Sequence, residues 1–194
     1  MKKVAVFASG NGSNFQAILD AVEAGTLKAE ISLLVCDRPG AFAVERAARA
    51  AVPFFIFNTK DFMDKAAYEM LILEQLKKLE IDFIVLAGYM RLIGPTLLKA
   101  YEGRIINIHP SLLPAFPGKD AIGQAFAARV AKTGVTVHYV DSGMDTGEVI
   151  AQRSVDIEPG ETKESLQAKI QRVEHELYPA VVERLLNGQK EAAL

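Results

Sequence analysis

The sequence predicts an α/β fold of three layers, in which a mostly parallel, twisted sheet of about seven strands carries helices on both faces. Short β-branched runs alternate with segments of helical periodicity from residue 3 onward. These runs are apolar at nearly every position, which is typical of parallel strands that are buried on both faces. A short polar link between the last two runs further predicts an antiparallel hairpin at the C-terminal end of the sheet.

The first half of the chain is expected to alternate strands and helices. Its first strand leads through a glycine-rich turn into a helix that ends near Gly25, a residue type suited to a helix end. A later helix has Asp61 as its expected cap and an apolar stripe that runs from Tyr68 to Leu79. The expected strands are 3–7, 31–35, 53–57 and 82–88, with a further helix at 41–51.

The second half begins with a short helix after Gly94 and Pro95, since proline suits the first turn of a helix. The chain closes with a helix from Thr162, which Pro179 is expected to kink and Asn187-Gly188 to end. Between them we expect a strand at 104–109, a helix at 121–131 and hairpin strands at 134–140 and 147–155.

The composition fits one soluble domain over residues 1–194, because the chain is 50% hydrophobic and has a formal net charge of −2. Its 22 basic and 24 acidic residues leave no excess of positive charge, which disfavours nucleic acid as a partner. The single cysteine, Cys36, indicates a reducing compartment. No apolar run is long enough for a signal core or for the roughly 20 residues of a membrane span, so we expect a cytoplasmic protein without a membrane partner.

A glycine-rich turn, "GNGSN" at 10–14, lies between the first strand and the first helix. Free backbone N–H groups and the helix dipole favour an anion at such a place, often a phosphate. A plain tight turn with Ser13 or Asn14 as the helix cap is the structural alternative. A dinucleotide site with Asp37 as the ribose-binding acid is a weaker alternative, because Phe15 replaces the third glycine of that fingerprint.

Two polar residues end the strand at 104–109. Asn107 and His109 point to the same face because strand side chains alternate, and they lie where open α/β sheets bind ligands. The exit loop carries Pro110, Pro114 and Pro117, which stiffen it into a wall beside the pair. Two convergent donors of this kind are suited to stabilising the oxyanion of an acyl transfer.

The link between the hairpin strands, "DSGMDTGE", contains Asp141 and Asp145. Aspartate is common in turns for local reasons, and taken alone both are structural. A calcium loop is disfavoured, because Gly143 and Gln152 break its register. If the hairpin packs beside the strand at 104–109, one of these aspartates can stabilise a charged His109 or relay a proton.

The chain resembles the phosphoribosylglycinamide formyltransferases in the motifs "SGNGSN", "LAGYMRLIGP", "NIHPSLLPAFPG" and "DTGEVIAQ", which occur in this order. The likeness extends from residue 1 to about 188. The third motif is shared with the wider superfamily of folate-dependent formyl transferases and hydrolases, whereas the first is more informative about the substrate. The resemblance implies a formyltransferase-type, Rossmann-like fold with a nucleotide phosphate-binding half at 1–100 and a folate-binding and catalytic half at 101–188.

The resemblance implies transfer of the formyl group of 10-formyltetrahydrofolate to the amine of glycinamide ribonucleotide in purine biosynthesis. The products are N-formylglycinamide ribonucleotide and tetrahydrofolate. The folate is a co-substrate, no metal is expected, and the partners are these small molecules. The family relation further implies a monomer or a homodimer.

The same matching assigns roles to residues by their positions in this sequence. The implied catalytic residues are Asn107, His109 and Asp145. The implied ribonucleotide-binding residues are Gly12, Ser13, Asn14 and Glu174. The implied folate-binding residues are Lys65, Met90, Arg91, Leu92, Ile93, Asn107, Val140 and Asp141. Lys65 stands where the family can have an arginine, so a planar two-pronged contact is lost while the charge is kept.

Other functions stay open at this point. A formyltetrahydrofolate hydrolase would share the chemistry with water in place of the amine, but is expected to carry an added N-terminal domain. A methionyl-tRNA formyltransferase is expected to carry a further C-terminal domain and a basic surface. A non-catalytic nucleotide-binding protein would keep the glycine turn without needing Asn107, His109 and Asp145 together.

Overall fold

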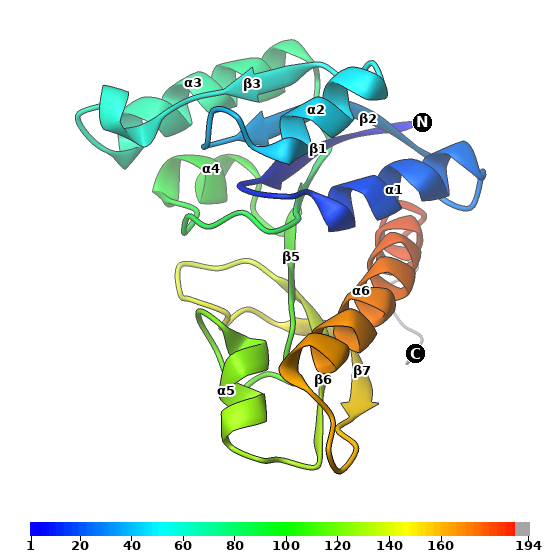
Figure 1. The fold of residues 1–194 in the computed structure, drawn as a ribbon. Helices are drawn as coiled ribbons and strands as arrows, with labels where there is room; N and C mark the ends of the chain where they lie inside the picture. Colours follow the sequence, from blue (N-terminus) through cyan, green and yellow to red (C-terminus); the bar gives the residue numbers. More distant parts are fainter. Residues whose placement is uncertain (189–194) are drawn as a thin grey trace.

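The computed structural model describes residues 1–188. Its centre is a seven-stranded sheet with the order β3-β2-β1-β4-β5-β6-β7 (Figure 1). The strands are β1 (Lys2–Ala8), β2 (Ala29–Cys36), β3 (Phe54–Ile56), β4 (Phe83–Leu86), β5 (Ile105–His109), β6 (Lys132–Tyr139) and β7 (Val149–Asp156). The helices are α1 (Ser13–Glu23), α2 (Phe42–Arg49), α3 (Lys65–Lys78), α4 (Pro95–Ala100), α5 (Ala121–Ala127) and α6 (Lys163–Leu186), with a short 3₁₀ helix, η1, at Thr59–Asp61.

Strand direction confirms the predicted fold class. β1 to β5 pair in parallel, whereas β6 is antiparallel to β5 and β7 is antiparallel to β6. The order of the parallel strands reverses between β1 and β4, which makes the carboxyl ends of these strands a topological switch point. Open α/β sheets commonly bind their ligands at such a point.

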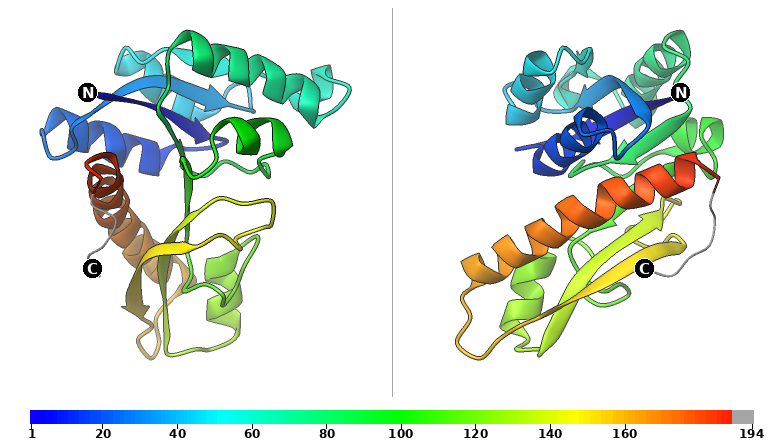
Figure 2. Two further views of the ribbon diagram at one scale, coloured as in Figure 1. Left: turned by 180° about the vertical axis from the view of Figure 1, so that it is seen from behind. Right: turned by 90° about the vertical axis from the view of Figure 1, so that its right-hand side faces the viewer.

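The sheet is covered on both faces, and the side-chain alternation of β5 shows how. Ile106 and Ile108 join a buried cluster with residues of α1, α2 and α6, whereas Ile105 joins a second cluster with residues of α3 and α4. Figure 2 shows α6 running along the β6–β7 part of the molecule. Asn107 and His109 share the face of Ile105, as their spacing predicts.

Two helix starts differ from the sequence-based expectation. The residue that caps α1 is Gly12, with φ 76° and no side-chain cap, so neither Ser13 nor Asn14 has this role. The cap of α3 is Asp64, whose side chain accepts from the N–H of Ala67 at 2.9 Å. The expectation of Asp61 was wrong because that residue ends η1.

Helix ends differ as well. α5 ends at Ala127 rather than 131, and Arg129 just beyond it has φ 53°, which is incompatible with a continuing helix. α6 begins after Thr162, whose hydroxyl accepts from the N–H of Ser165, and runs through Pro179 to Leu186 without interruption. None of the helices in residues 1–188 is both long and apolar enough to cross a membrane.

Candidate active site

Strand β5 links the parallel part of the sheet to the antiparallel strands β6 and β7, and it carries Asn107 and His109. It pairs with β4 over residues 105–107 and with β6 over 106–109, so Asn107 lies at the level where β4 ends. His109 lies beyond that level, beside β6 alone. Asn107 is half-buried and His109 is 6% exposed, so both side chains lie at the base of a site rather than on open surface.

The loop between β6 and β7 folds back over this pair and brings Asp145 to it. One carboxylate oxygen of Asp145 lies 3.5 Å from Nδ1 of His109 and accepts from the N–H of Gly118 at 2.8 Å. Asp145 has φ 56°, a left-handed conformation that aspartate tolerates better than most residues. The residues alone left open which aspartate meets His109, and the structure brings Asp145 there.

Asp141 is engaged within its own loop instead. Its Oδ1 accepts from the N–H of Gly143 at 2.9 Å and from the hydroxyl of Thr146 at 2.6 Å. The hydrogen bond from Thr146, followed by that from Gly143, lowers the pKa of this carboxyl. Asp141 therefore fixes the shape of the loop that carries Asp145.

The second nitrogen of His109 faces the proline-rich loop. Nε2 lies 2.9 Å from the carbonyl oxygen of Phe116, and because a carbonyl only accepts, Nε2 carries a hydrogen. The hydroxyl of Ser111 donates to the carbonyl of Ala115 at 2.6 Å, which ties the same loop back to its own start. In this arrangement both ring nitrogens of His109 have a defined partner.

His138 belongs to the same cluster, although sequence reasoning gave it no role. It is 2% exposed and pairs with Asn107 across β5 and β6. Its Nδ1 donates to the carbonyl of Tyr139 at 2.7 Å, which leaves Nε2 to accept from Nδ2 of Asn107 at 3.4 Å. Nε2 also lies 3.8 Å from Oδ1 of Asp145. The register of the antiparallel pair was the signal that could have identified it.

The glycine-rich turn is held by an arginine that sequence reasoning also missed. Arg46 donates through Nε to the carbonyl oxygen of Asn11 and through a terminal nitrogen to its side-chain oxygen, each at 2.9 Å. At Gly12 a Cβ atom would lie 2.8 Å from Cβ of Ala43, so α2 approaches the turn too closely for any side chain. The turn is therefore rigid before any ligand arrives.

Asn14 and Glu174 meet where α1 faces α6. Glu174 is 8% exposed, and burial raises the pKa of its carboxyl to about 7, although a hydrogen bond with the Asn14 side chain opposes the rise. Among the described residues, Oδ1 of Asn14 is a buried oxygen without a hydrogen-bond partner. Unsatisfied buried acceptors are costly, so this oxygen is suited to receive a donor from a ligand.

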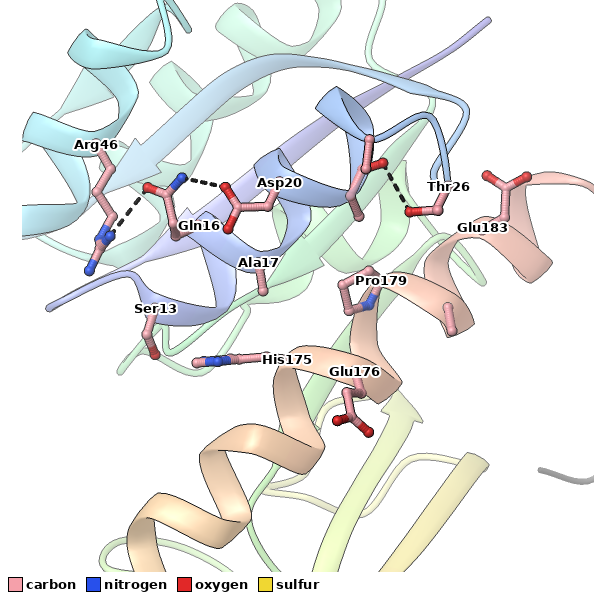
Figure 3. A pocket seen from close by; sticks show the side chains of 13 residues that line it. Ser13, Gln16, Ala17, Asp20, Thr26, Arg46, His175, Glu176, Pro179 and Glu183 are labelled. Atoms are coloured by element: carbon pink, nitrogen blue, oxygen red, sulfur yellow. Dashed lines mark hydrogen bonds between the residues drawn. The ribbon is translucent and has the colours of Figure 1, made fainter.

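A groove of about 820 Å³ runs between α1 and α6 and begins at the glycine-rich turn (Figure 3). Ser13, Arg46 and His175 line the end near the turn, whereas Asp20, Glu176 and Glu183 line the rest. Asn107, His109 and Asp145 do not contribute to it. The groove therefore adjoins the glycine-rich turn but is separate from the polar residues at the end of β5.

The segment between β4 and α4 contains the expected folate-binding run. Met90 is 60% and Leu92 46% exposed, whereas Ile93 is 5% exposed and packs in the core, so Ile93 can offer a ligand only its backbone. The Arg91 side chain forms an ion pair with Asp37 at 2.9 Å and is therefore not a free cation. Lys65 donates to the carbonyl oxygen of Leu92 at 2.8 Å and supports the same segment.

The remaining expected residues lie at the edges of this region. Val140 packs against the second core cluster, and its N–H donates to the carbonyl of Ile105 at 3.0 Å. Asp37, the acid of the dinucleotide alternative, has a side chain that is fully buried and paired. It is therefore unable to bind a ribose, and that alternative is wrong for this chain.

Comparisons with known proteins identify the family of the chain and agree with its fold. The family model described as "Formyl transferase" matches residues 2–182. The chain is 56% identical over 186 residues to a phosphoribosylglycinamide formyltransferase of Bacillus subtilis, covering 96% of this chain and 95% of the relative. The crystal structure of glycinamide ribonucleotide transformylase 1 from Geobacillus kaustophilus superposes with a TM-score of 0.94 at 68% identity, covering 96% of this chain and 99% of that one.

Proposed function

The chain belongs to the formyl transferase family, and on that premise we propose that it transfers a formyl group from 10-formyltetrahydrofolate to the amine of glycinamide ribonucleotide. The observation that carries the proposal is the convergence of Asn107 and His109 from strand β5 with Asp145 from the folded-back loop between β6 and β7. The relatives' names supply the acceptor and the transferred formyl group, the folate is the proposed donor, and the described side chains supply groups that this chemistry needs.

In the proposed reaction the neutral amine attacks the formyl carbon directly. A carbon–nitrogen bond to the glycinamide amine forms, the bond from the formyl carbon to N10 of the folate breaks, and the proton lost by the amine ends on N10. The formyl oxygen carries negative charge in the tetrahedral intermediate. One preorganised donor to such an oxygen typically contributes about 3 to 4 kcal/mol.

Asn107 and His109 are the proposed oxyanion donors. Asn107 offers Nδ2, which His138 orients at 3.4 Å. His109 offers Nε2–H, which the carbonyl of Phe116 accepts at 2.9 Å, so the formyl oxygen must replace that carbonyl. A negatively charged oxygen is a stronger acceptor than a carbonyl, which favours the exchange when the intermediate forms.

Asp145 is proposed to act through His109 and to assist the proton transfer. Its carboxylate, 3.5 Å from Nδ1, stabilises the positive charge of His109 when the ring takes up a proton at Nδ1 and keeps the Nε2–H that faces the oxyanion. The N–H of Gly118 holds the carboxylate in place at 2.8 Å. Asp145 is 11% exposed at its side chain, so water screens this interaction only in part.

The two substrates are proposed to enter from opposite sides of β5. For the ribonucleotide, Gly12, Ser13 and Asn14 offer a helix start and a buried acceptor, and Glu174 lies beside Asn14. For the folate, the exposed side chains of Met90 and Leu92 offer an apolar rim that suits a flat ring system. Lys65, Val140 and Asp141 border that rim from α3 and from the hairpin loop.

The experiment is a two-substrate turnover assay with the complete chain. Tetrahydrofolate should form from 10-formyltetrahydrofolate only when glycinamide ribonucleotide is present. Replacing His109 with alanine should lower kcat by about 100-fold or more, while KM for the ribonucleotide changes little, because His109 acts on the reacting oxygen. Tetrahydrofolate release without the nucleotide would favour a hydrolase, and uptake of nucleotide without any folate binding would favour a non-catalytic module.

The setting of the reaction is part of the same proposal. A pathway that makes purines operates on small soluble metabolites, and we propose a cytoplasmic enzyme with these two small-molecule partners and no nucleic acid. Both expected substrate sites draw on the 1–100 and 101–188 halves, since Glu174 lies on α6 and Lys65 on α3. Sedimentation of the purified chain distinguishes a monomer from a homodimer.

A further inference from the structure

We infer that Asp37 is a positioning residue for the folate site, where it fixes residues 88–94 through Ser9 and Arg91. The inference rests on the proposed function, because that function gives the segment 88–94 its ligand.

The segment 88–94 has no helix or strand to hold its shape. It connects β4 with α4, and Met90 and Leu92 project largely exposed from it. A short irregular segment that presents apolar side chains to a ligand needs other restraints to keep one conformation, since each free residue retains backbone entropy. Those restraints come from the side chains that directly follow β1 and β2 and from side chains of α3.

Asp37 follows β2 directly, and its side chain is completely buried. Its Oδ1 accepts from the hydroxyl of Ser9 at 2.5 Å, and its Oδ2 accepts from Nε of Arg91 at 2.9 Å. The oxygen of Ser9 in turn accepts from the backbone N–H of Met90 at 2.8 Å. One carboxylate therefore holds two successive residues of the segment, Met90 by its backbone and Arg91 by its side chain.

The carboxylate of Asp37, which anchors the segment, is itself held in place by the strands around it. Cys36, the neighbour of Asp37, is paired with Ala8 in the β1–β2 register, and Ser9 follows Ala8 directly. The N–H of Ser9 also donates to the carbonyl of Gly88 at 3.1 Å. Because the carboxylate is buried and each of its oxygens accepts a hydrogen bond, replacing one oxygen with an amide nitrogen leaves either Ser9 or Arg91 without its acceptor.

Arg91 is thereby assigned an anchoring role for its side chain. Its side chain is 40% exposed, and a terminal nitrogen of the guanidinium also donates to the hydroxyl of Thr59 at 3.2 Å. The far end of the segment has its own restraints, because Lys65 bonds the carbonyl of Leu92 and Glu69 accepts from the N–H of Gly94 at 3.0 Å. Loss of Asp37 therefore frees the first part of the segment while the second part stays fixed.

The test compares Asp37→Asn with Asp82→Asn in the complete chain. Asp82 also accepts from a backbone N–H, that of Lys3 at 2.8 Å, but lies at the start of β4, away from the segment. Asp37→Asn should raise KM for 10-formyltetrahydrofolate about tenfold and leave KM for the ribonucleotide within about twofold, since a tenfold change corresponds to one lost interaction of ordinary strength. Asp82→Asn should change neither.

A second variant guards against loss of folding. Arg91→Gln alters a partly exposed side chain, and it should raise the same KM by a similar factor. If Asp37 acts through Arg91, the double variant should be no worse than about twofold beyond either single one. Calorimetric titration of each variant with tetrahydrofolate provides a readout that does not need turnover.

The outcomes separate the inference from the proposed function. An unaltered chain that transfers no formyl group but binds tetrahydrofolate would refute the proposed activity and leave the anchor testable by calorimetry. An active chain in which Asp37→Asn and Arg91→Gln keep the unaltered folate KM would overturn the inference. Equal increases in the KM of both substrates would also overturn it, because they would indicate a general structural effect.

Discussion

Replacing Glu174 with glutamine should change how the free energy of unfolding depends on pH. Glu174 is 8% exposed, and its carboxyl has a pKa of about 7 in the folded chain against an ordinary value of 4.5. Between these two values the folded chain keeps the proton whereas the unfolded chain releases it. The stability that the protonated Glu174 provides is therefore complete below about pH 4.5 and declines as the pH rises toward 7.

The size of the effect follows from the same two values. Each pKa unit corresponds to about 1.4 kcal/mol, so the raised pKa corresponds to a loss of about 3 kcal/mol between pH 4.5 and pH 8. Glutamine has nearly the same shape, can still meet Asn14 and never ionises. The Glu174→Gln chain should match the unaltered chain near pH 4.5 and exceed its stability by about 3 kcal/mol at pH 8.

Urea unfolding at a series of pH values from about 4.5 to 8 measures this difference. Glu176→Gln is a suitable control, since Glu176 lies on the same helix with a side chain that is 63% exposed. The control should run parallel to the unaltered chain at every pH. A Glu174→Gln chain that also runs parallel would refute the reasoning, because it would mean that Glu174 ionises as easily in the folded state as in the unfolded one.

Three further substitutions test other parts of the description. Gly12→Ala should lower the free energy of unfolding in urea by about 1 to 3 kcal/mol and raise KM for the ribonucleotide. The reason is that alanine is strained at φ 76° and that its Cβ would meet Ala43. An unchanged unfolding midpoint would contradict this expectation. Asp145→Asn should lower kcat at least about tenfold in steady-state assays. Asp141→Asn should keep kcat within about threefold, since the hydrogen bonds of Asp141 lie within its own loop. Equal losses of kcat in the two variants would contradict the different roles given to the two aspartates. Tyr178→Phe should lower the free energy of unfolding by about 1 to 2 kcal/mol, because the buried hydroxyl donates to the carbonyl of Leu86 at 2.6 Å. A urea midpoint equal to that of the unaltered chain would show that this hydrogen bond makes no net contribution to stability.

The sheet and its covering helices were predictable because they depend on periodicity. Largely apolar runs predicted the strands from β1 to β5, and the short link at 141–147 between two further β-type runs predicted the antiparallel hairpin of β6 and β7. Local chemistry was harder to assign. Gly12 caps α1 through a left-handed backbone and the close approach of Ala43, which no pattern within the turn encodes. The cap at Asp64 was missed because Asp61 and Asp64 are equally suited to that role by residue type.

The part of the candidate site that depends on the alternation of side chains along one strand was predictable from the sequence. The part that depends on which strands and loops lie next to each other was not. Asn107 and His109 share a face by their spacing alone. His138 enters the cluster only through the β5–β6 register, and Asp145 only through a loop that folds back over the sheet. The Arg91–Asp37 pair joins residues 54 positions apart, so its formation depends on strand order rather than on any local signal. The catalytic and binding roles of these residues stay predictions until the assays above are done.

The position of the polar pair on a strand makes β5 intolerant of length changes. Insertion or deletion of one residue before Asn107 would turn the strand over, so that Ile106 and Ile108 would replace the amide and the imidazole at the reaction centre. The two polar groups would then be forced between aliphatic side chains of α1 and α6. Engineering of substrate scope in this scaffold must therefore preserve the numbering of residues 105–109.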